Sequence, residues 1–504
     1  MAPMRLIALF SLLLLASCDR PTAEVPSERA REIAAYSRTS YADAAVATLA
    51  DLLEFRTVHQ EGIENAENPD FQAQTAYLRR LAADLELDFA DHGAVVVIGL
   101  GDAQDRLGIV THGDLQPADP SKWAQDPFSL DTLSEPGRLI GRGVEDDKGP
   151  IAAALYAMKA VKDEELPLRR RVELIISLTE ESNWQPFMEY LERNKPPELN
   201  VALDSEYPLV IAENGWNSIM LSLPPTGDSP GDGPRLVLLT GGAFLSQIPE
   251  DATAVIANPT PELVARLQDA AAQHPEITYT FKRSADSLTV LARGVAAHSS
   301  KPWEGRNAIT HLAALLTAHD WRDSQAARMV QLINDLVGTG DYAEKFGEVA
   351  HTHPFMGRLT LSLTTLGYEE ENLVAGINIR SPAGRSPEQL EALLRETVAG
   401  WKEQTGFSDV TERIFTSPPY YLEDAPHIPV LLAIFAHYSG QPEAKPIAIG
   451  GGTHARLMPN GLNFGPAMPG EPYTGHSEHE YMRREIFLLT LEMYTAMLVE
   501  LAGG

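Results

Sequence analysis

Residues 172–181, VELIISLTEE, place two adjacent glutamates directly after an apolar, β-branched run. A run of this kind that ends in polar residues predicts a buried strand. Further strands are expected around it at residues 94–100, 107–111 and 200–203, and helices at residues 33–55, 72–85 and 149–162. Strands that alternate with helices predict an α/β fold, in which a mixed sheet lies between helices.

A second region begins near Gly215. Strand-like runs are expected at residues 235–239, 254–256, 287–292, 359–364 and 373–379, separated by helices at residues 261–272, 308–318 and 386–405. Two further helices are expected at residues 428–438 and 485–501. The residues able to carry chemistry concentrate outside the second region, so residues 215–416 are predicted to form an α+β lid domain. That lid would be inserted into one discontinuous catalytic domain made of residues 33–214 and 417–504.

The bulk composition limits the function. The chain has 504 residues, enough for two or three domains. It is 44% hydrophobic and 22% charged, as ordinary globular proteins are. The formal net charge of −30 argues against a nucleic-acid partner, because phosphate binding needs clustered lysines and arginines.

The N-terminus has the layout of a secretory signal. Residues 1–17 contain Arg5, then an apolar run, then small residues before Cys18. Residues 15–18 resemble a bacterial lipobox, in which Cys18 is lipidated, and residues 18–32 are polar enough for a tether. An uncleaved anchor helix is the alternative, but the apolar run is shorter than the ~20 residues that a span needs. We therefore expect a lipoprotein on the periplasmic side of the bacterial envelope that touches the membrane through its lipid alone; Asp19 favours the inner membrane.

Five polar clusters follow the expected strands or lie in adjoining loops. They are His112-Gly113-Asp114, Asp146-Asp147-Lys148-Gly149, Glu180-Glu181, Asp204-Ser205-Glu206 and His476-Ser477-Glu478-His479-Glu480. Open α/β sheets place their sites at such strand ends. Imidazole and carboxylate groups are zinc ligands, and several carboxylates together repel one another unless cations lie between them. Each cluster alone could be a turn, a helix cap or a surface residue, so the metal hypothesis depends on finding all five in one chain.

The order of these clusters resembles the superfamily of aminoacylases, succinyl-diaminopimelate desuccinylases, carnosinases and bacterial dipeptidases. The segments that carry the resemblance are residues 111–115, 141–149, 179–182, 297–308 and 450–476. Residues 204–208, 241–255 and 377–380 are similar to the monomeric bacterial dipeptidases of the Xaa-His (carnosinase) type. The resemblance covers nearly the whole chain after about residue 40, and implies a small peptide substrate and a monomer rather than a dimer.

The resemblance also implies two divalent ions, with zinc expected and manganese or cobalt also suited to such ligands. Asp146 would bridge both ions; His112 and Asp204 would complete one site, and Glu181 and His476 the other. In this family the bond after the bridging aspartate is often cis, here the bond to Asp147.

Glu180 would be the general base, and Asp114 would hydrogen-bond the far nitrogen of His112 to fix its tautomer. From the lid, His298 would donate to the developing oxyanion, and Arg380 would clamp the substrate carboxylate. His298 could instead only cap a loop, and Arg380 could pair with carboxylates of the lid. His351, His353, His454 and His479 are expected at the surface, and Trp123 and Trp216 in packing.

The backbone of Gly450, Gly451 and Gly452 would lie close to the substrate, where side chains would clash. Ser246 stands where the dipeptidase branch usually carries an asparagine that contacts substrate, which leaves the preferred dipeptide open. Three hypotheses follow for the function: a metallodipeptidase, an N-acyl amino-acid amidohydrolase or carboxypeptidase of the same superfamily, and a lipoprotein that captures peptides without cleaving them.

Overall fold

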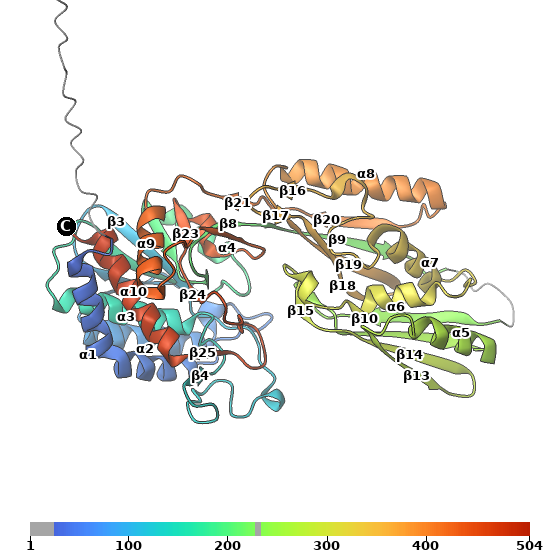
Figure 1. The fold of residues 1–504 in the computed structure, drawn as a ribbon, viewed down its shortest axis with the longest axis horizontal. Coiled ribbons are helices and arrows are strands. Elements are labelled where there is room, and N and C mark those ends of the chain that lie inside the picture. The colour runs from blue at the N-terminus through green and yellow to red at the C-terminus, as the bar shows by residue number, and fades with distance from the viewer. Residues whose placement is uncertain (1–24, 227–232) are drawn as a thin grey trace, which may run out of the picture.

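The computed structural model describes residues 25–226 and 233–504, which form two lobes (Figure 1). We call the lobe that contains α1 and the C-terminus the first lobe, and the other the lid. The predicted lipidation site Cys18, the signal peptide and most of the tether lie outside the described residues.

The first lobe is built on a mixed sheet. Described residues supply nine strands, in the order β1 (Asp88–Asp91), β2 (Val95–Leu100), β5 (Arg171–Ser177), β3 (Arg106–His112), β6 (Leu199–Ala202), β23 (Gly461–Asn463), β8 (Val210–Glu213) and β21 (Tyr420–Tyr421), with β22 (Ile447–Ile449) also pairing with β8. The centre is parallel, since β3 runs parallel to β5 and β6, and β23 runs parallel to β6. The four parallel strands β5, β3, β6 and β23 therefore end at one edge of the sheet.

Helices cover both faces of this sheet. On one face pack α1 (Glu28–Leu53), α3 (Lys148–Asp163) and α10 (Arg484–Ala502), with α9 (Ile428–Ser439) against α10 and α2 (Pro69–Asp84) beside them (Figure 1). On the other face lies α4 (Gln185–Arg193), whose Phe187 packs in a second apolar cluster. Val96 belongs to the first cluster and its neighbour Val97 to the second, because successive side chains of a strand point to opposite faces.

The lid has one antiparallel sheet. Its strand order is β13 (Thr278–Arg283), β14 (Ser287–Arg293), β12 (Asp251–Ala257), β10 (Arg235–Gly241), β18 (Thr360–Glu369), β19 (Asn372–Ser381), β9 (Gly215–Leu223) and β20 (Thr411–Phe415). The helices α5 (Pro261–Ala271), α6 (Ala308–Leu316), α7 (Gln325–Leu332) and α8 (Pro387–Thr405) share its apolar core. In β12 every second residue is buried, as a strand with one covered face requires.

Four short strand pairs complete the fold. They are β4 (Arg138–Ile140) with β25 (Tyr481–Arg483), β7 (Ser205–Glu206) with β24 (Pro466–Ala467), β11 (Gln247–Ile248) with β15 (Ala297–His298), and β16 (Thr352–His353) with β17 (Gly357–Arg358). The predicted fold class is confirmed: an α/β lobe carries a mixed sheet, and an α+β lid is inserted between β8 and β21.

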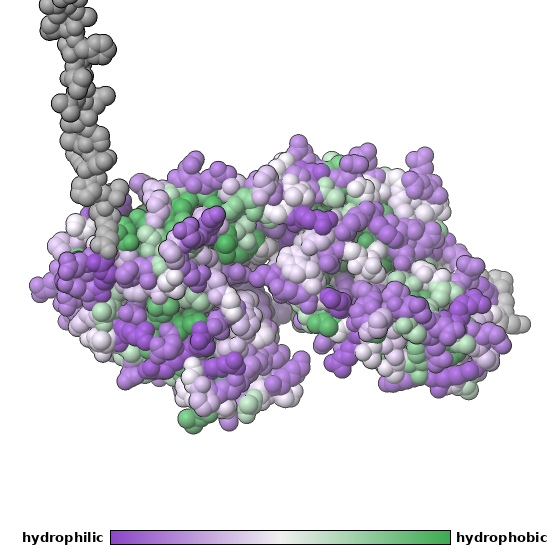
Figure 2. Space-filling view, viewed as in Figure 1, coloured by the Kyte–Doolittle hydropathy of each residue, from purple (hydrophilic) through white to green (hydrophobic). Residues whose placement is uncertain are grey.

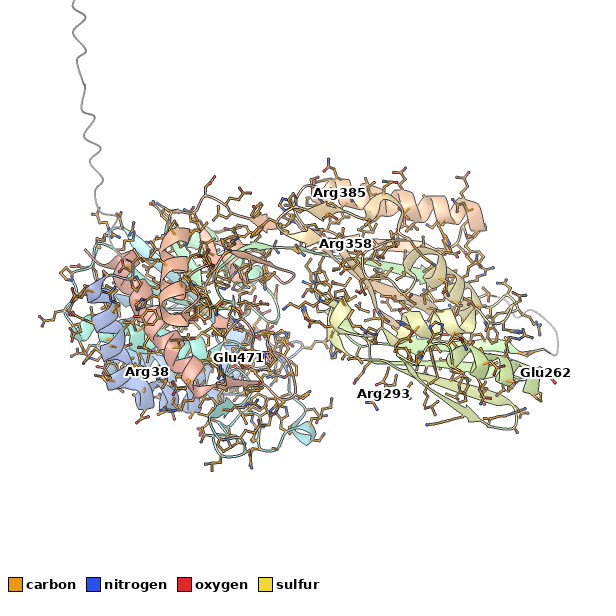
Figure 3. All side chains as sticks on the ribbon, viewed as in Figure 1. Arg38, Glu262, Arg293, Arg358, Arg385 and Glu471 are labelled. Carbon is orange, nitrogen blue, oxygen red and sulfur yellow. The ribbon has the colours of Figure 1, made fainter. Side chains whose placement is uncertain are left out.

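The predicted tether, residues 18–32, extends too far, because residues 28–32 are helical. Helix α1 begins at Glu28, not at residue 33, and Ser27 caps it by accepting a hydrogen bond from the amide of Ala30 through its side chain. Arg38 of α1, labelled in Figure 3, pairs with Glu492 of α10 at 3.0 Å, which fastens the first helix to the last. Among the described residues, no helix is both long enough and apolar enough to cross a membrane.

Candidate metal centre

His112 lies at the end of the central strand β3, where its side chain is 1% exposed. Its Nε2 lies 2.9 Å from Oδ1 of Asp146, and its Nδ1 lies 3.0 Å from the backbone carbonyl oxygen of Asp114. The second contact turns Nε2 towards Asp146 and leaves that nitrogen as the one able to bind a metal.

Asp146 lies between two histidines. Its Oδ1 faces His112, and its Oδ2 lies 3.0 Å from Nε2 of His476. The peptide bond from Asp146 to Asp147 is cis, as the family resemblance implied. A carboxylate with one oxygen towards each of two histidines has the arrangement of a bridge between two ions.

Two further carboxylates complete the set. Oδ1 of Asp204 lies 3.8 Å from Nε2 of His112, and Oε1 of Glu181 lies 2.7 Å from Nε2 of His476. Ligand atoms of His112, Glu180 and Asp204 lie within 4.8 Å of one another, as do those of His112, Asp146 and Glu181. The structure therefore brings together all five predicted metal ligands, and imidazole nitrogens with carboxylate oxygens suit divalent ions such as zinc.

The charges of this cluster compensate one another only in part. Burial would lower the pKa of His112, but the carboxylates of Asp204, Asp114 and Asp146 raise it well above its ordinary value. Burial would raise the pKa of Asp146, but His476 and His112 bring it well below its ordinary value. Burial raises the pKa of Asp204 to about 7. A cluster of imidazoles and carboxylates with such shifted pKa values is suited to divalent ions, which would replace the protons.

Glu180 and Glu181 follow β5 and are held by Asp114. The two carboxylate oxygens of Asp114 accept hydrogen bonds from the amides of Glu180 at 3.0 Å and Glu181 at 2.9 Å. The Asp114 carboxylate also lies near the predicted nitrogen, since its Oδ1 is 3.5 Å from Nδ1 of His112. The Asp114 carbonyl oxygen is closer to that nitrogen, at 3.0 Å. Asp114 thus contacts both His112 and the backbone of Glu180 and Glu181.

His298 lies on the lid, at the end of β15, and is exposed to solvent. Its Nδ1 lies 2.6 Å from Oγ of Ser300. Desolvation, followed by the positive charges of Arg380 and His476, lowers the pKa of His298 to about 3, even though part of the ring reaches water. The ring is therefore neutral at pH 7, and one ring nitrogen is a donor.

Arg380 of β19 is 3% exposed and contacts neutral groups. Its Nε donates to Oδ1 of Asn378 at 2.9 Å, one Nη to the carbonyl of Gly450 at 3.1 Å, and the other Nη to Oγ of Ser299 at 3.1 Å. Within residues 25–226 and 233–504, no carboxylate lies at ion-pair distance from it. Burial, followed by the charge of Arg456, lowers the pKa of Arg380 to about 9. A buried guanidinium without an anion is suited to an anionic ligand.

The glycine segment meets the lid beside Arg380. A Cβ atom on Gly450 would lie 2.2 Å from Cβ of Ser300, and one on Gly452 would lie 2.9 Å from Nη1 of Arg456. Gly451 differs, since its nearest such neighbour is 4.0 Å away. A side chain would therefore clash at Gly450 and Gly452 but not at Gly451. At Gly450 the clash would be with Ser300 of the lid.

Ser246 lies next to the segment that holds Arg380. Its carbonyl accepts the amide of Ser299 at 2.9 Å, and its Oγ lies 3.5 Å from Nε1 of Trp216. Figure 2 shows the two lobes in contact along one side and separated by an open notch on the other. Arg380 of the lid donates to the carbonyl of Gly450 of the first lobe, so this part of the lid lies where the lobes meet.

Sequence reasoning missed three residues of the centre. Tyr473 donates its hydroxyl to Oδ2 of Asp146 at 2.8 Å, and the buried carboxylates of Glu145 and Glu480 bond to the loops around it. Glutamates in loops are usually solvated, so only their position in the fold identifies Glu145 and Glu480.

His454 was expected at the surface, but it is 2% exposed. Its ring stacks on the ring of Phe187, with the two ring centroids 4.1 Å apart.

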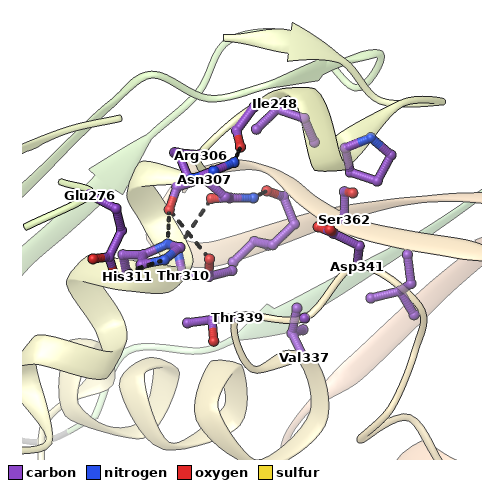
Figure 4. Close-up of a pocket in the computed structure, with 15 residues that line it drawn as sticks. Ile248, Glu276, Arg306, Asn307, Thr310, His311, Val337, Thr339, Asp341 and Ser362 are labelled. Atoms are coloured by element: carbon purple, nitrogen blue, oxygen red, sulfur yellow. Dashed lines mark hydrogen bonds and ion pairs between the residues drawn. The ribbon is translucent and has the colours of Figure 1, made fainter. Parts of the chain in front are cut away.

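A cavity of about 220 Å³ lies elsewhere, inside the lid (Figure 4). Arg306, His311 and Asp341 are among its lining residues, and none of the predicted metal ligands lines it. At its wall, Asn307 accepts the amide of Ile309 at 3.0 Å and donates to the carbonyl of Leu363 at 2.7 Å, so these polar groups are satisfied within the lid.

Comparisons with known proteins agree with the resemblance expected from the motifs. The model of peptidase family M20/M25/M40 matches residues 108–500. A β-Ala-Xaa dipeptidase of Lactobacillus delbrueckii subsp. lactis is 29% identical over 466 residues, which are 90% of this chain and 96% of that protein.

Two solved structures share the fold. Human carnosine dipeptidase 1 is 14% identical, with a TM-score of 0.53, and the match covers 93% of this chain and 99% of that one. The aminoacylhistidine dipeptidase of Vibrio alginolyticus is 14% identical, with a TM-score of 0.52 and coverage of 92% and 97%. With its site residues assembled and the family model matched over most of its length, this chain belongs to peptidase family M20/M25/M40.

Proposed function

We propose that the protein is a dipeptidase that uses two divalent metal ions. Its substrates are dipeptides or short peptides with a free C-terminal carboxylate. The observation that carries the proposal is the position of Asp146, with one oxygen 2.9 Å from His112 and the other 3.0 Å from His476. Arg380 supports a substrate with a free carboxylate, because its buried guanidinium has only neutral partners among the described residues.

The ligands form two sets that share Asp146. His112 and Asp204 complete one, and Glu181 and His476 complete the other. When bound, divalent ions supply a Lewis acid for the scissile carbonyl and lower the pKa of a bound water towards ~7. Zinc is the metal we propose, and manganese or cobalt suits the same ligands.

The protein's own groups handle the proton and the substrate. Glu180 accepts a proton from the attacking water and returns it to the nitrogen of the leaving amine. Burial, followed by the charge of Asp204, raises the pKa of Glu180 well above its ordinary value in the metal-free chain. A basic carboxylate of this kind is suited to both steps. Asp114 holds the backbone of this segment, which keeps the Glu180 side chain directed at the centre.

Two lid residues hold the peptide. His298 donates a hydrogen bond to the oxygen that becomes negative when water attacks the carbonyl. Arg380 holds the C-terminal carboxylate by charge-assisted hydrogen bonds. The lid and the first lobe of one chain also meet at Lys301 and Glu206, 3.1 Å apart. A single chain can therefore bring both halves of the site together, and we propose that the protein works as a monomer.

The test uses purified protein, stripped with a chelator and reloaded with zinc, manganese or cobalt. Unblocked dipeptides should be cleaved only after reloading, and N-acetyl amino acids more slowly. Glu180→Ala should lower kcat about 100- to 10,000-fold with metal content unchanged. Faster cleavage of N-acetyl amino acids would make the protein an amidohydrolase. Activity that survives complete chelation, or a wild-type rate in Glu180→Ala, would refute the mechanism.

A further inference from the structure

Two loops of the metal centre leave adjacent strands. The Asp146 loop, residues 141–147, joins β4 to α3, and the His476 loop, residues 468–480, joins β24 to β25. Strands β4 and β25 pair in antiparallel fashion, with Ile140 opposite Tyr481. The start of the Asp146 loop therefore lies beside the end of the His476 loop, but this pairing ends before either ligand is reached.

Glu480 of the His476 loop bonds to the backbone of the Asp146 loop. Its Oε1 accepts the amides of Gly143 at 3.0 Å, Glu145 at 2.9 Å and Asp146 at 3.1 Å. Its Oε2 pairs with Nη1 of Arg142 at 2.8 Å. Both side chains of this ion pair are buried, at 1% exposure for Arg142 and 0% for Glu480. One carboxylate thus binds three amides of the backbone that presents Asp146.

Glu145 makes the reverse connection. Its Oε2 accepts the amides of Thr474 at 2.7 Å and Gly475 at 3.1 Å, and lies 3.0 Å from Oγ1 of Thr474. These residues come directly before His476, whose φ of 63° lies in the left-handed region. A residue other than glycine adopts that conformation only where its surroundings hold it there.

We infer that Glu145 and Glu480 are positioning residues that form a reciprocal carboxylate clasp. Each comes from one loop and binds the backbone of the other, so the clasp fixes the separation of Asp146 and His476. The inference rests on the proposed function in one respect, namely that Asp146, Glu181 and His476 hold one of two ions. Ligands fixed before binding need no ordering when the metal arrives, which strengthens binding.

The clasp should act unequally on the two ion sites. His112 is held by β3, and Asp204 directly follows β6, so their positions come from the parallel centre of the sheet. His476 has no regular element of its own and depends on the clasp. Loosening the clasp should therefore weaken the ion of His476 and Glu181 more than the ion of His112 and Asp204.

The experiment measures binding of zinc and manganese to the metal-free full chain by chelator competition and calorimetry. The variants are Glu145→Gln and Glu480→Gln. The control is Glu471→Gln, which removes a carboxylate of the same loop that pairs with Arg483 at 2.6 Å and not with the Asp146 loop (Figure 3). Glu145→Gln should raise the dissociation constant of the weaker ion about 10- to 100-fold, with the tighter ion within about threefold of wild type. Glu480→Gln loosens the backbone of Asp146, which both ion sites share, and should weaken both ions.

Excess metal should restore most of kcat in Glu145→Gln, with KM for the peptide unchanged, because only ion positioning is affected. Glu145→Gln decides alone if Glu480→Gln fails to fold, since the glutamine has the size of the glutamate but removes the negative charge that strengthens the bonds to Thr474 and Gly475. Both ions bound as in wild type by Glu145→Gln would overturn the clasp. Equal weakening in Glu471→Gln would do the same. A wild-type chain that binds no ions would instead refute the proposed function itself.

Discussion

The first lobe and the lid treat buried charge in opposite ways. In the first lobe, two buried carboxylates pair with arginines: Glu480 with Arg142 at 2.8 Å, and Glu213 with Arg456 at 3.5 Å. In the lid, Arg380 is buried among neutral acceptors, and His298 is exposed. The first lobe therefore pairs these charges within the chain, whereas the lid offers groups suited to the substrate that we propose.

The largest effect that would sharpen this contrast is expected at His298. We predict that His298→Ala lowers kcat about 100- to 1,000-fold, because the developing oxyanion loses a donor. KM and metal content should change little, since the ligands all belong to the first lobe. Steady-state kinetics with metal analysis measures both. His298→Gln, which keeps an N–H donor, should recover part of the rate; equal rates in wild type and His298→Ala would mean that the lid takes no part in chemistry.

The next effect concerns stability of the first lobe, at His427. This residue is 1% exposed, donates from Nε2 to the carbonyl of Asn200 at 3.2 Å, and precedes α9. Burial lowers the pKa of His427 from 6.5 to about 4. Between these values the unfolded chain binds more protons than the folded one, so stability should fall as the pH falls from 6.5 towards 4.

For this one group the loss between pH 7 and pH 5 is about 2 kcal/mol. Urea unfolding of the chelated protein at both pH values measures it, and chelation keeps metal release out of the comparison. His427→Asn lacks the titrating group, so its loss should be smaller than that of wild type by about this amount. The same pH dependence in both proteins would show that folding does not lower the pKa of His427. The first lobe would then hold a buried cation at this position that has no carboxylate beside it.

The smallest effect is expected at Arg380. We predict that Arg380→Lys lowers kcat/KM about tenfold, or about 1.4 kcal/mol, for peptides with a free carboxylate. A lysine keeps the charge, but cannot hold Asn378, Gly450 and a carboxylate at once. A C-terminally amidated dipeptide is the matched control and should be cleaved equally by both proteins. If Arg380→Lys slows the amidated peptide as much, the guanidinium supports the lid and does not hold the carboxylate.

Strand ends were the part of the site most open to prediction from the sequence. The run VELIISLT ends at Glu180 and Glu181, and in the structure β5 delivers both next to His112, which ends β3. Parallel neighbours bring such ends together, so order along the chain was enough. The lid was also predictable in outline, because strands with one buried face, such as β12, alternate buried residues with more exposed ones.

Contacts between loops were not predictable in this way. Glu145 and Glu480 are separated by hundreds of residues and lie in segments rich in charged residues, where a carboxylate is usually solvated. Strands β1 and β13 were missed because few of their residues are buried. Helix α1 was predicted too short, since residues 28–32 are polar and their helical state depends on the cap at Ser27.

The positions of the two chain ends affect how the protein can be attached. The amide of Ser27 donates to Oε1 of Glu500 at 2.6 Å, so the described N-terminal end and the last helix lie together, on the lobe away from the lid (Figure 1). Anchoring through either end, whether by a lipid or on a biosensor chip, would leave the notch facing outward and the lid unhindered. An affinity tag at residue 504 should likewise be tolerated, whereas one inserted in the lid would lie on the lobe that carries His298 and Arg380.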